Sequence, residues 1–436
     1  MINEDYEITF GVELELVFGF REGLLRTYLK SIQDSSQIVK GISEGDRVTM
    51  ASHLNSGGYT DRPRYMGWGL TGQTQHPLVG WNSEHSIRTY GDEPMQIARA
   101  IFPDMLYDIG VHFDSDKQSS YSRWYFTDDC SVAGVDEATL LAKLRPRIGT
   151  VGHWDSHGIE LVSPVFGFTP TVFDELSDLL TRLKGTDADD HGALITDNCG
   201  LHIHVGLPPT PGTSNFQNPR FDLPTLQHLA YLLVMYEPHI STLHPPSRRA
   251  GSPASTIDLQ TNLTNFRAPA PKPPSPTMDW VPSSSAADPA FLRPLLPLAA
   301  VRAKIWRNGM TPSRLANLMG RDKGRLVNWT GLHRGAGEGP RTVEFRQHEG
   351  TLDAEAVRWW ARFVMGLVRL ANAMAGGSPR GAGDGYRWRE WSEGMCVWEL
   401  FEMMGFEEEG RRYFGRRGAF CAVEMRGVEV GGRRGA

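Results

Sequence analysis

The sequence has few cysteines, no long apolar run and no excess of basic residues. Its 436 residues include only four cysteines. These lie far apart with no Cys-x-x-Cys pair, so the sequence suggests neither a disulfide framework nor a structural zinc module. No apolar run approaches the roughly 20 residues that a membrane-spanning helix needs. The net charge of −6 and the pI near 6.2 argue against a general nucleic-acid-binding protein, whose surface would be basic.

Two further absences concern location and nucleotide chemistry. The acidic N-terminus runs straight into an alternating segment, unlike a signal or transit peptide, so we expect a cytoplasmic protein. No Gly-x-x-x-x-Gly-Lys-Ser/Thr motif occurs, which excludes a P-loop nucleotide site. The remaining composition, 40% apolar and 22% charged, is that of a soluble globular protein.

The most informative stretch runs from Asn198 to Gly206, with the sequence NCGLHIHVG. Successive side chains of a β-strand point to opposite faces, so His202 and His204 share one face and three apolar residues share the other. Glycines at both ends are expected where the backbone turns or lets a ligand approach closely. The alternative is a half-exposed strand with two hydrogen-bonded histidines, and the polar faces of three other predicted strands argue against it.

Two other predicted strands carry carboxylates on one face. Residues 6–18 alternate with a period of two, with apolar side chains on one face and Glu13 and Glu15 on the other. These two glutamates lie roughly 7 Å apart along the strand and repel each other unless a cation neutralises them. In residues 157–164, Glu160 points away from the face of its apolar neighbours. Each pattern also fits a strand that simply faces solvent.

A predicted hairpin late in the chain carries a glutamate and an arginine. Residues 326–332 and 341–348 are predicted strands on either side of a glycine-rich loop. On the second strand Glu344 and Arg346 share a face. They fit a plain cross-strand ion pair, which is worth little at a surface, as well as a functional site.

Helices are expected between and after these strands. A short aromatic strand is predicted over residues 123–132, and a long apolar helix over residues 223–243. Arg248 and Arg249 follow that helix, and they fit contacts with phosphate groups or a solvated helix exit equally well. The other predicted helices cover residues 136–144, 169–183, 290–308, 312–319, 353–374 and 391–404.

Three regions have the composition of peripheral segments. Residues 34–120 are rich in Ser, Gly, Gln, Asp and His, and residues 250–290 in Pro, Ser, Ala and Thr. Gly, Arg and Glu dominate after residue 376. Such segments offer too little apolar surface to offset the entropy lost on ordering. We therefore predict one domain over residues 1–375, with insertions at about 34–120 and 250–290, and a partly disordered extension over residues 376–436.

Together the polar faces of the strands indicate a metal site. They offer Glu13, Glu15, Glu160, His202, His204, Glu344 and Arg346. Carboxylates with little imidazole suit Mg²⁺ or Mn²⁺ better than a closed zinc site, which favours several His or Cys ligands. A guanidinium is suited to the charge on a phosphoryl group in transit. The pattern alone therefore predicts a metal site whose charge is compatible with phosphate.

Five segments resemble, in the same order, motifs of the putative amidoligase family, a branch of the glutamine synthetase-like carboxylate–amine ligases. They are FGVELE (10–15), DCSV (129–132), GIELVSP (158–164), NCGLHIHVG (198–206) and RTVEFRQHEGTLD (341–353). Each motif is weak alone, but five in one order are specific. The resemblance covers residues 6–20, 123–250 and 325–374, roughly half of the chain.

The resemblance implies an α+β fold, with a glutamine synthetase-like antiparallel sheet, helices on its outer face and ATP bound in its concavity. Residues 1–375 would form an amidoligase-like catalytic domain. The implied metal ligands are Glu13, Glu15, Glu160, His202 and Glu344. His204 would lie nearer the substrate or phosphate, and Arg346 would stabilise the transferred phosphoryl group. Arg248 and Arg249 are further candidates for binding the nucleotide. Glutamine synthetase has one more metal glutamate shortly after the position of Glu160, and this sequence has none in an equivalent frame, so the number of metal ions is open.

The implied activity is that of an ATP-dependent carboxylate–amine ligase that works through an acyl phosphate, with ATP and Mg²⁺ or Mn²⁺ as cofactors. Its substrates would be a carboxylate and an amine, as small molecules or peptides, with no nucleic acid or membrane involved. Two alternatives belong to other classes. One is a metal-dependent hydrolase that uses the His-x-His pair and the carboxylates to activate water. The other is a non-catalytic scaffold of the same fold, which ranks last because every residue of the predicted metal face is present.

Overall fold

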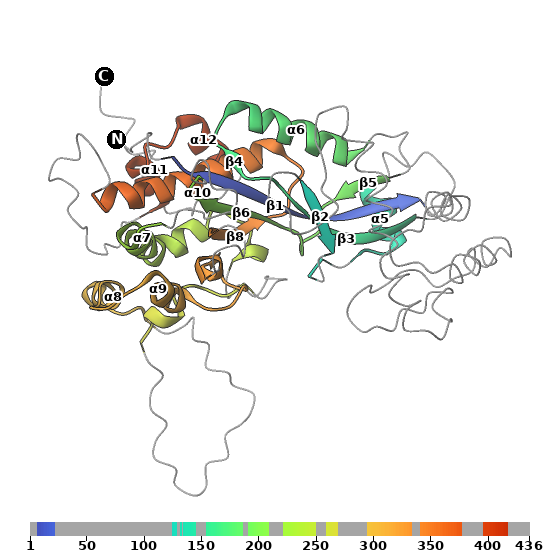
Figure 1. Ribbon diagram of the computed structural model, residues 1–436. Coiled ribbons are helices and arrows are strands. Elements are labelled where there is room, and N and C mark those ends of the chain that lie inside the picture. The colour runs from blue at the N-terminus through green and yellow to red at the C-terminus, as the bar shows by residue number, and fades with distance from the viewer. Residues whose placement is uncertain are drawn as a thin grey trace, which may run out of the picture. The chain divides into compact units, whose positions relative to one another are not determined.

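A computed structural model of the protein combines helices with an antiparallel sheet (Figure 1). The structure describes residues 7–21, 124–128, 131–132, 134–144, 154–185, 191–208, 221–249, 259–268, 294–333, 341–376 and 396–416. The mixed α+β class and the antiparallel sheet predicted from the sequence are confirmed. None of the helices in these segments has both the length and the apolar character that crossing a membrane requires.

Eight strands of the described residues form one sheet. They are β1 (Thr9–Arg21), β2 (Tyr125–Asp128), β3 (Trp154–Val162), β4 (Phe166–Gly167), β5 (His191–Leu194), β6 (Gly200–Gly206), β7 (Val327–Asn328) and β8 (Val343–Glu349). The strand order is β2-β3-β1-β6-β8-β7, and β4 and β5 also pair with β1. The strands predicted to carry the polar faces, β3, β1, β6 and β8, are therefore consecutive neighbours.

Helices connect and cover these strands. The α-helices are α5 (Glu137–Leu144), α6 (Pro170–Lys184), α7 (Leu223–Ser241), α8 (Leu298–Ile305), α9 (Pro312–Met319), α10 (Ala354–Met374), α11 (Val397–Met403) and α12 (Glu408–Arg416). The short 3-10 helices are η3 (Pro246–Arg248), η4 (Thr264–Phe266) and η6 (Thr330–His333). The residue before a helix accepts a hydrogen bond from a backbone N–H of the first turn at the starts of α7 and α9. Asp222 accepts from the Thr225 N–H at 2.7 Å, and Thr311 accepts from the Arg314 N–H at 3.2 Å.

The first strand is the longest and is organised by its alternation. The expected apolar face is buried throughout the strand, through Ile8, Phe10, Val12, Leu14, Leu16 and Phe18. On one side β1 pairs antiparallel with β3, from Glu13 opposite Val162 to Arg21 opposite Trp154. A one-residue slip in this register would turn the apolar face to the polar side, so burial fixes the position of the glutamates.

Backbone contacts divide the chain into two units, each built from distant segments. One comprises residues 11–201 and 350–358, and the other comprises residues 1–10, 202–349 and 359–436.

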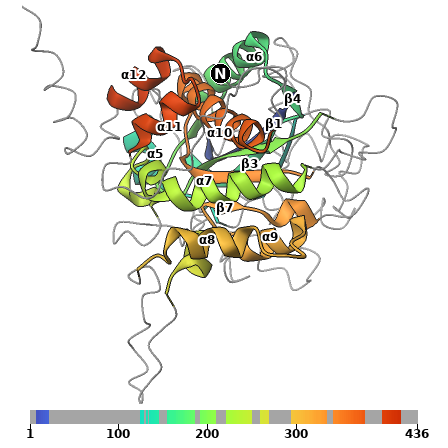
Figure 2. The same ribbon diagram turned by 90° about the vertical axis from the view of Figure 1, so that its left-hand side faces the viewer.

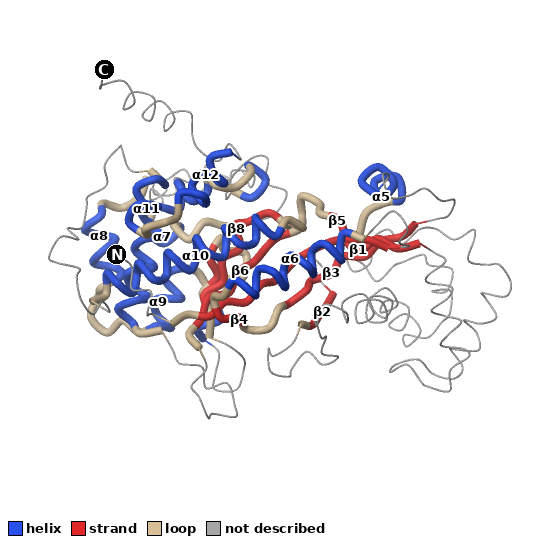
Figure 3. Tube along the Cα trace, turned by 90° about the horizontal axis from the view of Figure 1, so that it is seen from above, coloured by secondary structure: helices blue, strands red, loops and turns tan. Residues whose placement is uncertain are grey.

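In the unit with residues 11–201, helix α5 contacts β3 and β5, and helix α6 contacts β5 (Figure 3). Its apolar cluster consists of Val17, Val132, Leu140, Leu144, Trp154, Leu194 and Cys199. Gly158 of β3 is essential to this packing because a Cβ there would lie 1.8 Å from the Val132 carbonyl oxygen. The glycine in the GIELVSP motif is thus required by close approach of another backbone.

In the other unit, α8 and α9 lie beside α7 (Figure 2). The buried stripe predicted for α10 is confirmed, since Val357, Trp360, Ala361, Val364, Leu367, Val368 and Ala371 are all fully buried. Asp353 caps this helix as expected, accepting from the Glu355 N–H at 3.0 Å.

Some predicted elements differ in extent. The strand predicted over residues 326–332 ends after Asn328, because the side-chain oxygen of Asn328 accepts from the N–H and hydroxyl of Thr330 and starts η6. The helix predicted over residues 290–308 is confirmed only as α8, with Pro297 at its N-cap. The glycine-rich hairpin loop before residue 341 lies outside the described residues.

Two of the regions predicted to be peripheral contain packed segments. Residues 259–268, inside the predicted insertion 250–290, bury Leu263 and Phe266. Residues 396–416 form α11 and the unpredicted α12, whose aromatic side chains pack on α10. Both segments contain isolated apolar residues that a regional average of composition hides. The predicted insertion 34–120 lies outside the described residues, and the domain boundary near residue 375 stays a prediction.

Candidate active site

The centre of the polar face is the carboxylate of Glu344 on β8. It is buried, with 6% of the residue exposed. Its Oε2 accepts from Asn328 Nδ2 at 2.5 Å. Its Oε1 forms an ion pair with Arg346 and lies 3.6 Å from His202 Nδ1. The Arg346 Nη1 in turn lies 3.3 Å from His202 Nδ1. Glu344, Arg346 and His202 thus form one polar cluster from two neighbouring strands.

The local sequence explains this meeting. On β8, Glu344 and Arg346 are two residues apart and share a face, with buried Val343 and Phe345 on the other. On β7, Asn328 lies opposite Glu344 in the antiparallel register. Cross-strand partners bring their Cβ atoms within about 5.5 Å, close enough for a direct hydrogen bond between side chains.

The second histidine of the pair is oriented by a threonine. His204 Nδ1 lies 3.0 Å from the hydroxyl of Thr342, the residue just before β8. Thr342 is itself held in place because Gly331 packs against its backbone, where a Cβ would come within 2.6 Å of the Thr342 oxygen. The bond fixes the rotation of the His204 ring, as partners of metal-binding histidines commonly do.

Strands β1 and β3 supply the remaining carboxylates. Glu15 lies directly opposite Glu160 in the register of these strands. Glu15 is only 3% exposed, whereas Glu13 and Glu160 are partly exposed. Burial raises the pKa of the nearby Cys199 thiol, and the negative charge of Glu15 adds to this effect. Several acidic groups on adjacent strands repel one another unless a cation lies among them.

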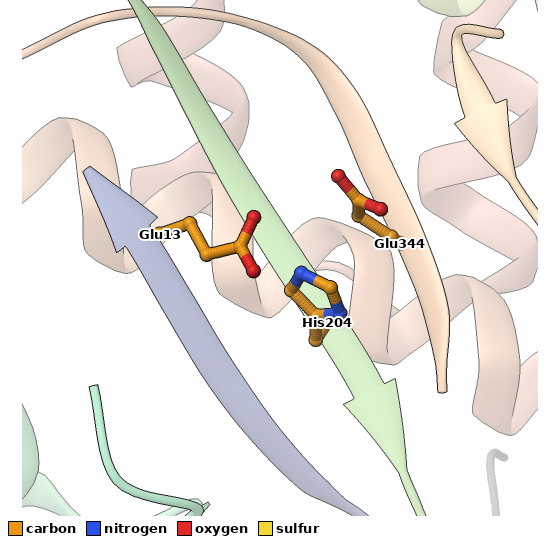
Figure 4. A group of neighbouring side chains, drawn as sticks. All are labelled: Glu13, His204 and Glu344. Carbon is orange, nitrogen blue, oxygen red and sulfur yellow. The ribbon is translucent and has the colours of Figure 1, made fainter. Parts of the chain in front are cut away.

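Two groups of these side chains have the spacing of metal ligands. One group is Glu13, His204 and Glu344, and the other is Glu13, Glu160 and His202. Within each group the ligand atoms all lie within 4.8 Å of one another. Figure 4 shows the first group, with Glu13 coming from β1, His204 from β6 and Glu344 from β8. Glu13 belongs to both groups.

The ligand set expected from the sequence overlaps with these two groups. Glu13, Glu160, His202 and Glu344 occur in them, and Glu15 occurs in neither. His204, expected nearer the substrate, joins a possible ligand set. The metal-binding and catalytic roles of these residues stay predictions.

The two adjacent arginines face different surroundings. Arg248 is 2% exposed, and its Nη2 donates to the backbone carbonyl of Arg346 at 2.7 Å. Arg249 donates to the carbonyl oxygens of Thr242 at 3.3 Å and of His244 at 2.8 Å, just after α7. Arg249 therefore has the contacts of a helix exit, and Arg248 supports the strand of Arg346. Nucleotide binding by either residue stays a prediction.

Sequence reasoning missed the residues that support the site. Asn328, Thr330 and Thr342 each hydrogen-bond within or next to the cluster. Thr342 could have been identified, because it shares the predicted face of Glu344. Asn328 could not, because its partner depends on the hairpin register, which a seven-residue strand pattern does not fix.

Comparison with known proteins supports the motif resemblance. A family model described as "Putative amidoligase enzyme" matches residues 6–255. No curated protein and no solved structure matched the chain. The match includes Glu13, Glu160 and both histidines but ends before β8, which the sheet brings next to β6. Because the match spans more than half of the 436 residues, the chain belongs to the putative amidoligase family.

Proposed function

We propose that the chain is an ATP-dependent carboxylate–amine ligase that forms an amide bond through an acyl phosphate. The observation that carries this proposal is the spacing of Glu13, His204 and Glu344 within 4.8 Å, beside an arginine, in a chain of the amidoligase family. We also infer a glutamine synthetase-like arrangement, in which the polar face of the sheet receives ATP, and a cytoplasmic location.

The donor set fits a hard divalent cation. Each of the two groups contains two carboxylates and one imidazole, and such oxygen-rich sets suit Mg²⁺ or Mn²⁺. A bound cation of this kind neutralises and orients the phosphate oxygens of ATP. Glu13, Glu160, His202, His204 and Glu344 are the side chains that would hold it. Because Glu13 is common to both groups, it is the ligand on which either arrangement depends.

Arg346 is the residue best suited to the phosphoryl group in transit. Glu344 and His202 orient its guanidinium, while 21% of its side chain remains exposed. A preoriented donor of this kind stabilises charge that develops in the transition state without reorganising. His204, held by Thr342, is available to the same phosphate or to a cation. Arg248 contributes by supporting the backbone of Arg346.

The proposed reaction has two steps. A substrate carboxylate attacks the γ-phosphorus of ATP, the bond from that phosphorus to the leaving oxygen breaks, and ADP and an acyl phosphate result. The uncharged amine then attacks the acyl carbon, the carbon–oxygen bond to phosphate breaks, and the nitrogen loses a proton. The protein contributes positioning and charge neutralisation, and it must keep water from the acyl phosphate. The substrates are a carboxylate and an amine, as small molecules or peptides.

The test is an assay of ADP release with pooled carboxylic acids and amines in the presence of ATP and Mg²⁺. A ligase sustains ADP release over many turnovers only when both an acid and an amine are present, and it forms one amide per ADP. Removal of divalent cations by a chelator should stop the release, and Mg²⁺ or Mn²⁺ should restore it. ADP release that needs neither substrate would contradict the ligase proposal, and metal-dependent hydrolysis without ATP would favour the hydrolase.

A further inference from the structure

Asn328 supports the carboxylate of Glu344 from the neighbouring strand. It is 4% exposed and lies opposite Glu344 in the register of β7 and β8. Its Nδ2 donates to Glu344 Oε2 at 2.5 Å. Its Oδ1 accepts from the backbone N–H of Thr330 at 2.9 Å and from the Thr330 hydroxyl at 2.7 Å. The amide therefore makes three hydrogen bonds in a buried setting.

The chemistry of Thr330 fixes which way the amide of Asn328 points. A backbone N–H can only donate, so the side-chain atom of Asn328 that faces it must be the oxygen. The NH₂ group then faces Glu344, and the Glu344 oxygen at this contact must accept. The turn that starts η6 thus determines the direction of a hydrogen bond at the polar cluster.

The two oxygens of Glu344 have different partners as a result. Oε2 is held by the neutral amide of Asn328, and Oε1 pairs with Arg346 and faces His202. With both oxygens held, the plane of the carboxylate is fixed. The amide of Asn328 adds no charge, so Arg346 supplies the cationic partner of Glu344.

We propose that Asn328 is a positioning residue for the proposed ligase, acting through Glu344. It sets the carboxylate so that one oxygen serves Arg346 and the cation side of the cluster. Hydrogen-bonded supports of metal-binding carboxylates typically contribute 10–100-fold in metal affinity or activity. The inference rests on the proposed function for its effect on turnover, but the hydrogen bond itself is tested separately below.

The first test is Asn328→Asp, which keeps the shape of the side chain and its acceptor for Thr330 but turns an acceptor towards Glu344. We expect the affinity of the nucleotide-free protein for Mn²⁺ to fall about 10–100-fold. We expect kcat to fall by a similar factor, with KM for acid and amine within a few-fold, because positioning acts in the transition state. Mn²⁺ binding is read by electron paramagnetic resonance, so this arm does not depend on turnover.

The matched control is Asn317→Asp on α9. Asn317 Oδ1 accepts from Arg321 Nε at 2.7 Å, a bond that aspartate keeps, so the same substitution there should change neither Mn²⁺ affinity nor turnover. Parental Mn²⁺ affinity and parental turnover in Asn328→Asp would overturn the inference.

A second test uses the double variant Asn328→Asp with Glu344→Gln, which exchanges donor and acceptor across the pair. Thermal unfolding of the parent, both single variants and the double variant forms a cycle. We expect each single substitution to lower the unfolding midpoint, and the loss in the double variant to be smaller than the sum of the two. Strictly additive losses would contradict a hydrogen bond between Asn328 and Glu344. If the parent neither binds Mn²⁺ nor releases ADP, the proposed function fails, and the cycle still decides whether Asn328 supports Glu344.

Discussion

Arg346 combines two properties that a surface ion pair lacks. Its guanidinium is oriented by Glu344 and His202 on a polar face. Its backbone N–H and its backbone carbonyl are both hydrogen-bonded to other segments. The Arg346 N–H donates to the Leu326 carbonyl at 2.9 Å, and its own carbonyl accepts from Arg248 at 2.7 Å. A rigid backbone and an oriented side chain are what a donor aimed at developing charge requires.

We predict that Arg346→Lys folds normally and binds nucleotide but loses about 10²–10³-fold in amine-dependent ADP release. Lysine keeps the charge but loses the planar fork that pairs with phosphate oxygens. The measurement is kcat for ADP release with acid and amine saturating, alongside nucleotide affinity and thermal unfolding.

Arg362→Lys provides the control. Arg362 of α10 has a side-chain exposure of 23%, close to the 21% of Arg346. Its partner Glu407 is 53% exposed and is not a member of the polar cluster. The substitution of Arg362 should leave turnover within a few-fold of the parent. A similarly small effect for Arg346→Lys would return that residue to the status of an ordinary ion pair, worth about 0–1 kcal/mol.

Glu13 and Glu15 are expected to differ although they look equivalent in sequence. Glu13 belongs to both possible ligand groups and Glu15 to neither. We therefore predict that Glu13→Gln weakens Mn²⁺ binding at least about tenfold more than Glu15→Gln, in line with the loss of a direct ligand. Isothermal titration of the nucleotide-free variants measures this. Equal losses would mean that Glu15 also binds the cation, as the family resemblance implies.

At the residue scale the sequence identified most of the polar face and missed its supports. Period-two alternation placed Glu13, His202 and Glu344 on polar faces without any tertiary information, because a strand leaves only two directions for a side chain. The same rule places Glu13 and Glu15 on one face, so the sequence alone does not distinguish them. Alternation cannot say which carboxylate oxygens lie near the histidines of β6, and of these two glutamates only Glu13 shares a ligand group with them.

At the scale of elements, β3 depends on one glycine. A Cβ at Gly158 would lie 1.8 Å from the Val132 carbonyl oxygen and 2.7 Å from its carbon, so the backbones would have to separate. We predict that Gly158→Ala lowers the free energy of unfolding by about 3 kcal/mol or more, at the upper end of overpacking effects. Gly167→Ala on β4 is the matched control, because a Cβ there meets nothing within 4 Å. Urea unfolding of both variants should show a loss only for Gly158→Ala, and equal stability would contradict the close approach.

Helix α7 carries two buried groups whose titrations oppose each other. Burial raises the pKa of Glu237 from 4.5 to about 7, although Thr261 and the Asn262 N–H donate to its carboxylate. Burial lowers the pKa of His228 from 6.5 to about 4, and the nearby Arg302 adds to this effect. Between pH 4.5 and 7 the folded state holds the extra proton on Glu237, so this group makes stability fall as pH rises. Between pH 4 and 6.5 the unfolded state holds the extra proton on His228, so this group makes stability rise.

We predict that removing either group exposes the slope of the other. In Glu237→Gln, stability should rise more steeply than in the parent between pH 4.5 and 6.5. In His228→Phe, which keeps an aromatic ring against Trp306, the slope of stability against pH should be more negative than in the parent over the same window. Each effect is on the order of 2–3 kcal/mol. Urea unfolding at half-unit pH intervals measures the slopes, and slopes parallel to the parent in both variants would refute the buried titrations.

Elements with strong periodicity were predicted well, and elements decided by tertiary contacts were not. The buried stripe of α10 recurs at the helical period over about four turns. Helix α7 was predicted from its length and apolar composition, and it is buried on nearly every face. Strand β5 was missed because His191–Leu194 is too short and too small in its side chains to give a pattern, and it exists because it pairs with β1. Strand β7 is shorter than predicted because the side chain of Asn328 accepts from the Thr330 N–H, and the backbone turns into η6 at that point.

At the scale of the whole chain, segments that look peripheral by composition build part of the core. Residues 259–268 are held by buried Asn262, which donates to the carbonyls of Met319 and Val327 and accepts from the Val327 N–H. This side chain bonds the backbone of β7, so a segment inside a proline-rich region supports the strand of Asn328. Regional composition misses such contacts because a few well-placed residues decide them.

The C-terminal helices give the clearest case. The rings of Phe401 and Phe414 stack 5.8 Å apart, and both meet Phe363 of α10, at 5.7 and 6.1 Å. Phe401 and Phe414 are 0% and 1% exposed. The surrounding glycines, arginines and glutamates keep the average apolarity of residues 376–436 low, so composition alone does not reveal the packing of these aromatic side chains.

We predict that Phe414→Ala lowers the free energy of unfolding by about 3–5 kcal/mol, the usual cost of removing a buried phenylalanine ring. A truly peripheral C-terminal segment would tolerate this change, since substitutions away from packed sites stay within about 0.5 kcal/mol. The control is Glu402→Ala, an exposed position on α11, where alanine also favours the helix. Thermal and urea unfolding of both variants decide the matter. A midpoint for Phe414→Ala equal to that of Glu402→Ala would mean that the aromatic contacts with α10 contribute nothing to stability and that the chain folds without α12.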